Sequence, residues 1–292
     1  MRQKLFINLL LLGQIFFLAN TEAKNNLIKE NVDECFPPSK LRFSKNLKST
    51  SGLNEFEFNQ LIDRVDRVMG PVIQRQTKKK VIFERNWNDD EVNAHATRDD
   101  EDNLVVMLTG GLARHPLMTK DAFLLIACHE IGHFLGGAPK QFRGNTQQRT
   151  WSSAEGQADY YASTKCLPLL FQDKTETKAL DLSLNPEVKR KAFTRCDNDV
   201  CARIVVAGWQ ISSVFASLRE GTIKPDIIKN DPTLVDVTFM KHPNPQCRLD
   251  TFVMGANCDA PVDEAFSDFD PKIGACLYAK KNARPACWYK DE

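Results

Sequence analysis

The strongest constraint on the fold of this chain is an apolar helical run that carries two histidines four residues apart. Thr119 begins the run and Gly136 ends it, and the sequence HEIGH stands near its end, from His129 to His133. Positions four apart lie one turn apart on the same face of a helix. We therefore expect a helix on which both imidazoles face one point.

Two imidazoles in this arrangement can bind one zinc ion, and Glu130 between them can take a proton from a water molecule. The chain has only 5 histidines, and most residues around these two are apolar. Both facts argue against two ordinary surface histidines. The sequence therefore predicts a zinc site in which Glu130 is the general base.

A catalytic zinc site usually has three protein ligands and one open position. In one group of zinc peptidases the third ligand is a histidine six residues after the second, but here Pro139 stands at that position. The better candidate is Glu155, the first residue of the sequence EGQAD. Asp159, its last residue, shares the same helix face and can accept the free N–H of a ligand histidine, which fixes the tautomer. We expect one Zn²⁺ per chain, bound by His129, His133 and Glu155.

The first 23 residues have the features of a signal peptide. Arg2 and Lys4 give a positive start, and the apolar run that follows is about 15 residues long, short of the roughly 20 that a membrane helix needs. Small residues lead to a cleavage site after Ala23. We therefore expect an exported protein, periplasmic or secreted, with no stable membrane span after cleavage.

The 9 cysteines fit an oxidising compartment, and an odd number leaves one unpaired in a monomer. Cys128 is our candidate for the unpaired thiol because it lies inside the apolar helical run. The other eight could form four disulfides, with Cys196 and Cys201 close enough in sequence to be partners. The chain contains no CxxC pair, which argues against a cysteine-ligated zinc cluster.

The charge is balanced. Without Arg2, Lys4 and Glu22, the 39 basic and 38 acidic side chains of the full chain become 37 and 37. This balance argues against nucleic acid or an anionic membrane as the main partner. The apolar helix expected over residues 201–218 contains Arg203 and several serines, so it is expected in the core rather than in a membrane.

The remaining pattern predicts an α+β fold that is mostly helical, with the zinc-site helices beside a small sheet. A helix begins near Phe56 and is expected to stop at Gly70-Pro71, and Ser152 or Ser153 is expected to cap the helix that runs from Glu155 to Lys165 and stops at Pro168. Short strands are expected at residues 81–83, 91–96 and 104–108.

Four ordered segments together resemble the gluzincin metalloendopeptidases of the HtpX and CAAX-prenyl-protease type. These segments are HEIGH, EGQAD, the region from Val92 to Leu112, and His242-Pro243 followed by Arg248. The resemblance covers roughly residues 56 to 250. Two features depart from the family, which is often membrane-integrated and not typically rich in disulfides. The resemblance implies a zincin-like peptidase domain at 56–250. An N-terminal segment at 24–55 precedes this domain, and a cysteine-rich extension at 251–292 follows it and packs on it.

The resemblance also implies roles for residues outside the two zinc motifs. His242 would donate to the oxyanion or approach the metal, and Arg248 would hold acidic side chains behind it. A peptide substrate would bind as an added strand beside residues 104–108, with Asn93 and Val106 at the groove. The implied activity is zinc-dependent hydrolysis of peptide bonds in proteins outside the cytoplasm.

Two other functions stay open at this point. A zinc-bound binding protein on a peptidase fold would commonly lose the general base, and here Glu130 is present. A disulfide-stapled structural protein with a fortuitous motif is the third possibility, and the matching pair of Glu155 and Asp159 weighs against it.

Overall fold

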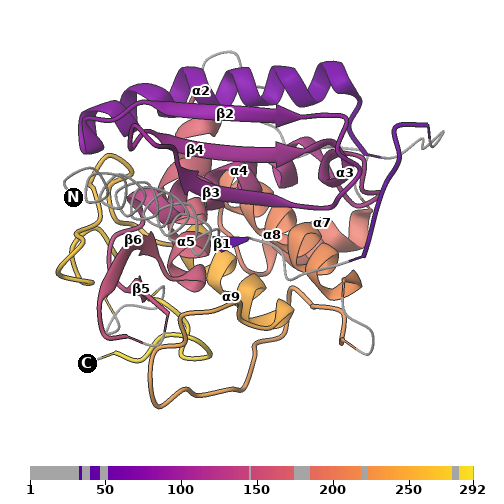
Figure 1. The fold of residues 1–292 in the computed structure, drawn as a ribbon. Helices are drawn as coiled ribbons and strands as arrows, with labels where there is room; N and C mark the ends of the chain where they lie inside the picture. Colours follow the sequence, from indigo (N-terminus) through magenta and orange to yellow (C-terminus); the bar gives the residue numbers. More distant parts are fainter. Residues whose placement is uncertain are drawn as a thin grey trace, which may run out of the picture. The chain divides into compact units, whose positions relative to one another are not determined.

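The structure is a computed structural model, and it describes residues 33–34, 40–46, 52–144, 146–173, 185–218, 222–277 and 283–291. The expected signal peptide and Cys35 lie outside these residues. The chain divides into two units, Met1–Asp33 and Glu34–Glu292, and nearly all described residues belong to the second. The second unit is α+β and mostly helical, as the sequence predicts (Figure 1).

The elements of the described chain follow one another in this order: β1 (Asp33–Glu34), α2 (Glu55–Thr77), β2 (Val81–Asn86), β3 (Ala94–Arg98), β4 (Leu104–Thr109), α3 (Gly110–Ala113), α4 (Lys120–Leu135), β5 (Lys140–Phe142), β6 (Arg149–Ser153), α5 (Glu155–Tyr161), the π-helix η1 (Ala162–Cys166), α6 (Leu167–Phe171), α7 (Pro186–Phe193), α8 (Asp199–Ser217) and α9 (Pro245–Ala256).

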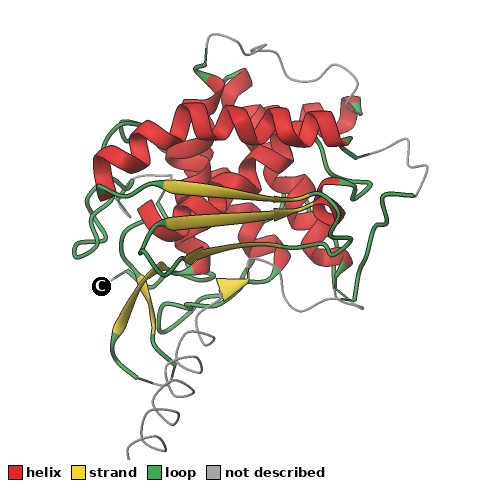
Figure 2. Ribbon diagram, turned by 45° about the horizontal axis from the view of Figure 1, so that its top comes forward, coloured by secondary structure: helices red, strands yellow, loops and turns green. Residues whose placement is uncertain are grey.

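Strand β4 is the centre of the main sheet. It runs parallel to β2, with Val81 opposite Leu104, and antiparallel to β3, with Ala94 opposite Leu108. All six residues of β4 are buried, which suits a strand of apolar residues with neighbours on both sides. Helix α4 packs against β3 and β4 and passes behind them in Figure 1, with α5 and α8 drawn below β3. Figure 2 shows helices behind the strands from a second direction.

Helix α2 is longer than its sequence pattern predicts. Asn54 and Glu57 form a capping box at its start, but the expected stop at Gly70-Pro71 is wrong, because the helix continues to Thr77. Met69 and Ile73 on either side of the proline are both fully buried in the core. Burial of one continuous apolar face therefore outweighs the local cost of a proline inside the helix.

Helix α8 is, within the described residues, the one helix long and apolar enough to cross a membrane by length and composition alone. However, 83% of its apolar window is buried inside the protein. It packs against α4 and α9, which is the behaviour of a core helix.

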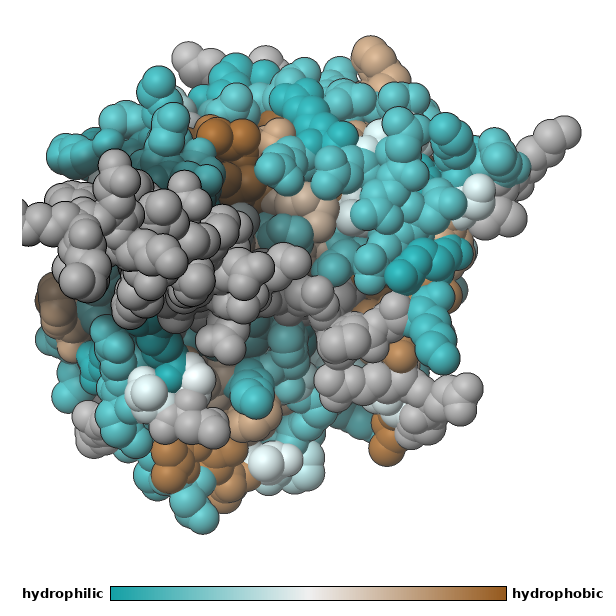
Figure 3. All heavy atoms as spheres, in the orientation of Figure 1, coloured by the Kyte–Doolittle hydropathy of each residue, from teal (hydrophilic) through white to brown (hydrophobic). Residues whose placement is uncertain are grey.

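Over the face shown in Figure 3, hydrophilic residues predominate among those described.

Four disulfides join the eight described cysteines. They are Cys128–Cys166, Cys196–Cys201, Cys247–Cys287 and Cys258–Cys276. The pairing of Cys196 with Cys201 is confirmed, but the assignment of Cys128 as the unpaired thiol is wrong. Packing of α4 against η1 brings the Cα atoms of Cys128 and Cys166 to 5.5 Å, a distance that no local pattern reveals. Multiple disulfides indicate an oxidising, extracellular-type environment.

The Cys128–Cys166 disulfide is expected to stabilise the fold more than the Cys196–Cys201 disulfide. The two cysteines are 38 residues apart in the first disulfide and 5 residues apart in the second. In the chain-entropy account, the disulfide that closes the larger loop restricts the unfolded chain more. Replacing both cysteines of the first pair by alanine should lower the free energy of unfolding by about 4 kcal/mol, against about 2 kcal/mol for the second pair. Urea unfolding of the two double variants measures both; equal losses would contradict this account.

Candidate metal centre

Helix α4 supplies the first two candidate ligands. Thr119 caps it by accepting a hydrogen bond from the Ala122 backbone N–H, and the helix is buried from Ala122 to its end at Leu135. His129 and His133 therefore project one turn apart into the protein interior, as their spacing predicts, and their ring centroids lie 4.8 Å apart. Glu130, between them in sequence, is fully buried as well.

Helix α5 supplies the third candidate ligand, Glu155. It begins at Glu155 after the N-cap residue Ala154, which offers no side-chain cap, so the expectation that Ser152 or Ser153 caps this helix is wrong. Both serines belong to β6. The Glu155 backbone N–H instead donates to the carbonyl of Met240 at 3.2 Å. The first turn of α5 is thus bound by a distant segment rather than by its own cap.

The sequence predicts that this helix stops at Pro168, and that prediction is wrong. The π-helix η1 and then α6 extend the same run to Phe171, with Pro168 in the first turn of α6, where a missing N–H is tolerated.

Close packing of α4 on α5 brings the ligands together. Gly132 faces the backbone of Ala158, and a Cβ atom at Gly132 would lie 2.7 Å from the Ala158 carbonyl oxygen. Only glycine permits this approach. Gly132 of HEIGH therefore allows α4 and α5 to pack closely, while the two histidines beside it are candidate metal ligands.

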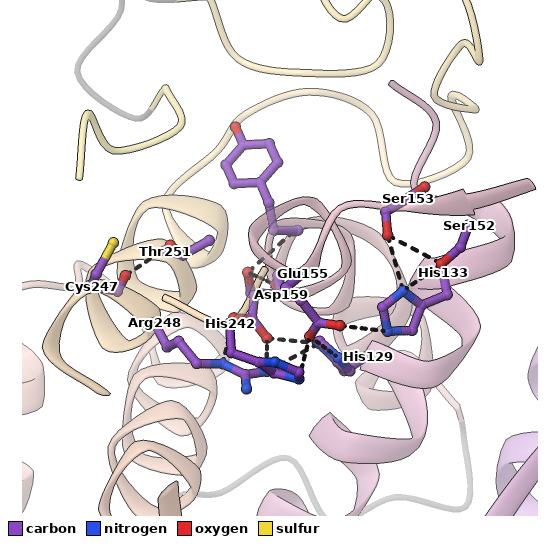
Figure 4. Close-up of polar contacts among 12 residues, drawn as sticks. His129, His133, Ser152, Ser153, Glu155, Asp159, His242, Cys247, Arg248 and Thr251 are labelled. Atoms are coloured by element: carbon purple, nitrogen blue, oxygen red, sulfur yellow. Dashed lines mark hydrogen bonds and ion pairs between the residues drawn. The ribbon is translucent and has the colours of Figure 1, made fainter. Parts of the chain in front are cut away.

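The three candidate ligand atoms converge. Glu155 Oε2 lies 3.4 Å from His129 Nε2, and Glu155 Oε1 lies 3.7 Å from His133 Nε2. Dashed lines in Figure 4 mark these contacts. All three ligand atoms lie within 4.8 Å of one another, and the three residues are buried. A tetrahedral zinc ion with bonds of about 2.0–2.1 Å holds its ligands about 3.3–3.4 Å apart. The donor set suits zinc, and the two Glu155 distances are close to this spacing.

The far side of each imidazole is fixed by an acceptor. Nδ1 of His129 lies 2.7 Å from Oδ1 of Asp159, and Nδ1 of His133 lies 3.0 Å from the carbonyl oxygen of Ser153. Each acceptor favours the tautomer with hydrogen on Nδ1, so that the Nε2 lone pair faces the centre of the site. Among the described residues, Nε2 of His133 has no hydrogen-bond partner although it is buried, as expected of an atom aimed at a metal.

Asp159 is itself held by Arg248 from α9. The guanidinium donates from Nε to Oδ2 at 2.8 Å and from its terminal nitrogen to Oδ1 at 2.7 Å, and both residues are buried. Burial alone would raise the pKa of Asp159, but Arg248 and His129 lower it below its usual range. The carboxylate therefore stays charged and can accept the His129 N–H. Asp159 and Arg248 thus lie on the Nδ1 side of His129, away from its Nε2 atom.

His242 lies on the exposed side of the centre. Its Nε2 is 3.4 Å from Glu155 Oε2, and its side chain is 25% exposed, against 2% for that of Glu155. Burial alone would raise the pKa of Glu155, but the imidazoles of His242, His133 and His129 lower it. Burial lowers the pKa of His133 to about 4, which keeps its imidazole neutral at pH 7, as a metal ligand must be.

The expected substrate groove beside residues 104–108 is wrong in position. Strand β4 is already paired along both edges, with β2 and β3, so no peptide can add beside it. Val106 is fully buried, and Asn93 is 7% exposed, with Oδ1 accepting from the Ala94 backbone N–H at 2.8 Å. The sequence could not reveal this because strand order depends on contacts distant along the chain.

Sequence reasoning also missed several residues around the centre. The Ser153 carbonyl is a backbone group and leaves no side-chain signal. Gln157 stands inside EGQAD, and its amide donates to the carbonyl of Gly136 at the end of α4 at 2.6 Å. Only its position within the motif could have drawn attention to it.

Comparison with protein families, curated proteins and solved structures gave no match for this chain.

Proposed function

We propose that the protein is a zinc-dependent endopeptidase that hydrolyses peptide bonds in proteins outside the cytoplasm, on a zincin-like domain. The observation that carries this proposal is the convergence of His129, His133 and Glu155, with both histidines held through Nδ1. The four segments that resemble the HtpX and CAAX-prenyl-protease type of gluzincin add support. The disulfides support a location outside the reducing cytoplasm.

The reaction divides among the residues of the site as follows. His129, His133 and Glu155 would hold a zinc ion, which would supply Lewis acidity toward a water molecule and the substrate carbonyl. The Glu130 carboxylate would accept one proton of that water as its oxygen bonds to the carbonyl carbon, and would give the proton to the amine nitrogen as the C–N bond breaks. His242, on the exposed side, can donate a hydrogen bond to the carbonyl oxygen as it gains negative charge. Asp159 and Arg248 hold the His129 ring in place.

The alternative is a zinc-bound binding protein without catalysis. Glu130 separates the two proposals, because a binding protein has no need for a buried carboxylate beside the ligands. Casein hydrolysis and zinc content, measured on one purified sample of the mature protein with and without a chelator, test both. About one zinc per chain with chelator-sensitive cleavage is expected. No zinc after reconstitution would overturn both proposals, and zinc without cleavage of any protein substrate would favour the alternative.

Replacing Glu130 by Gln should separate catalysis from metal binding. The amide keeps the size of the side chain but cannot accept the proton, so turnover should fall by about 10²–10⁴-fold. Zinc content should stay near that of the wild type. The measurement is steady-state hydrolysis together with metal analysis on the same sample. Full activity in Glu130→Gln would exclude Glu130 as the base.

Replacing Glu155 by Ala should weaken zinc binding itself, because one of three protein ligands is lost. Competition with a chromophoric chelator gives the zinc dissociation constant directly. Glu187→Ala is a matched control, since the Glu187 side chain is 63% exposed and lies in α7, outside the site. An unchanged zinc affinity in Glu155→Ala would mean that the third ligand lies elsewhere.

Asp159→Asn should reduce zinc affinity by about 10–100-fold while leaving all three ligands in place. The amide can no longer hold the His129 N–H and the Arg248 guanidinium as a carboxylate does. Asp63→Asn is the control, because Asp63 is paired with Arg85 on the surface at 61% exposure. Equal zinc affinity in Asp159→Asn and the control would show that the pair with Arg248 serves folding alone.

A further inference from the structure

The C-terminal tail (residues 283–291) packs against helices that carry residues of the candidate metal centre. Three of its residues contact elements that carry site residues: Arg284, Cys287 and Trp288. Nothing in the two zinc motifs explains these contacts. They raise the question of whether the tail only covers the core or takes part in placing the ligands.

Trp288 packs against the first turn of α5. Its ring is fully buried and lies so close to Gly156 that a methyl group there would overlap it. Gly156 is the residue after Glu155. Within the described residues the indole N–H makes no hydrogen bond, so the ring acts by packing. Trp288 thus fixes the backbone that carries the third ligand.

Arg284 joins the two zinc-site helices through Gln157. Its Nε donates to Gln157 Oε1 at 2.5 Å, and the Gln157 amide in turn donates to Gly136 at the C-cap of α4. Arg284 is 4% exposed and also donates to the carbonyl of Pro271 at 2.9 Å. A buried cation thereby holds the end of the helix with His133 at a set distance from the helix with Glu155.

The tail also contacts the segments that carry Arg248 and His242. Cys287 is bonded to Cys247, the residue before Arg248, and the Trp288 carbonyl accepts from the Phe239 backbone N–H at 2.7 Å. The segment after Phe239 carries the Met240 carbonyl that binds Glu155, and then His242. Every element with a site residue is therefore connected to the tail directly or through one residue.

We propose that Arg284 and Trp288 are positioning residues of the metal centre, so that zinc retention depends on the last nine residues of the described chain. This inference rests on the proposed zinc site. It gives the cysteine-rich extension a role: the Cys247–Cys287 disulfide holds the tail against α9, and the tail holds α5 against α4.

The test compares zinc affinity in two variants with matched controls. Arg284→Gln and Trp288→Leu should each raise the zinc dissociation constant by about 10-fold, the lower range for residues that orient ligands. Arg195→Gln and Trp209→Leu are the controls, since those side chains bind the loop after α8 through Asn230 and Pro225. Chelator competition gives the constants, and thermal unfolding of the zinc-free proteins measures stability separately.

A coupled pair keeps the test decisive if a single variant does not fold. Gly156→Ala should weaken zinc binding because the new methyl group meets the Trp288 ring. Adding Trp288→Leu removes that collision and should recover part of the lost affinity. Two results would overturn the inference. One is that Arg284→Gln and Trp288→Leu lower the stability of the zinc-free protein but have the zinc dissociation constants of the controls. The other is that the double variant recovers no zinc affinity. A wild-type protein that binds no zinc would instead overturn the proposed function.

Discussion

The structure depends on one buried carboxylate, Asp159, which serves two partners at once. It accepts from His129 on α4 and from Arg248 on α9, while belonging itself to α5. A charge without a partner in this interior would be strongly unfavourable, so the three helices must meet where Arg248 can reach it. Arg248 also stacks on Phe215 of α8, with 3.7 Å between the guanidinium carbon and the ring centroid. One ionic contact thus relates four helices.

Much of the site could be predicted because it is encoded locally. His129 and His133, and likewise Glu155 and Asp159, are pairs four residues apart, and helix geometry alone places each pair on one face. That the two helices face each other cannot be read from spacing, but the chemistry of zinc demands a third ligand and so links the motifs. The structure brings His129, His133 and Glu155 together and places Asp159 Oδ1 2.7 Å from Nδ1 of His129.

The expectations that failed concern contacts distant along the chain. The pairing of Cys128 follows from α4 lying on η1, and the closed edges of β4 follow from the order of strands in the sheet. The local rule for proline predicts that a helix stops at Pro71, but burial of the apolar face in the core overrides this rule. The start of α5 needs no capping side chain because the Met240 carbonyl binds the Glu155 N–H, and no local pattern announces that partner.

The two C-terminal disulfides are nested, with Cys258–Cys276 inside the loop that Cys247–Cys287 closes. A single peptide-bond break anywhere between residues 247 and 287 therefore leaves both fragments joined covalently. This stretch contains Phe269, which is 89% exposed. A chain cut there would still keep Trp288 attached to α9 through the Cys247–Cys287 disulfide. Its integrity then rests on sulfur bonds rather than on an unbroken backbone.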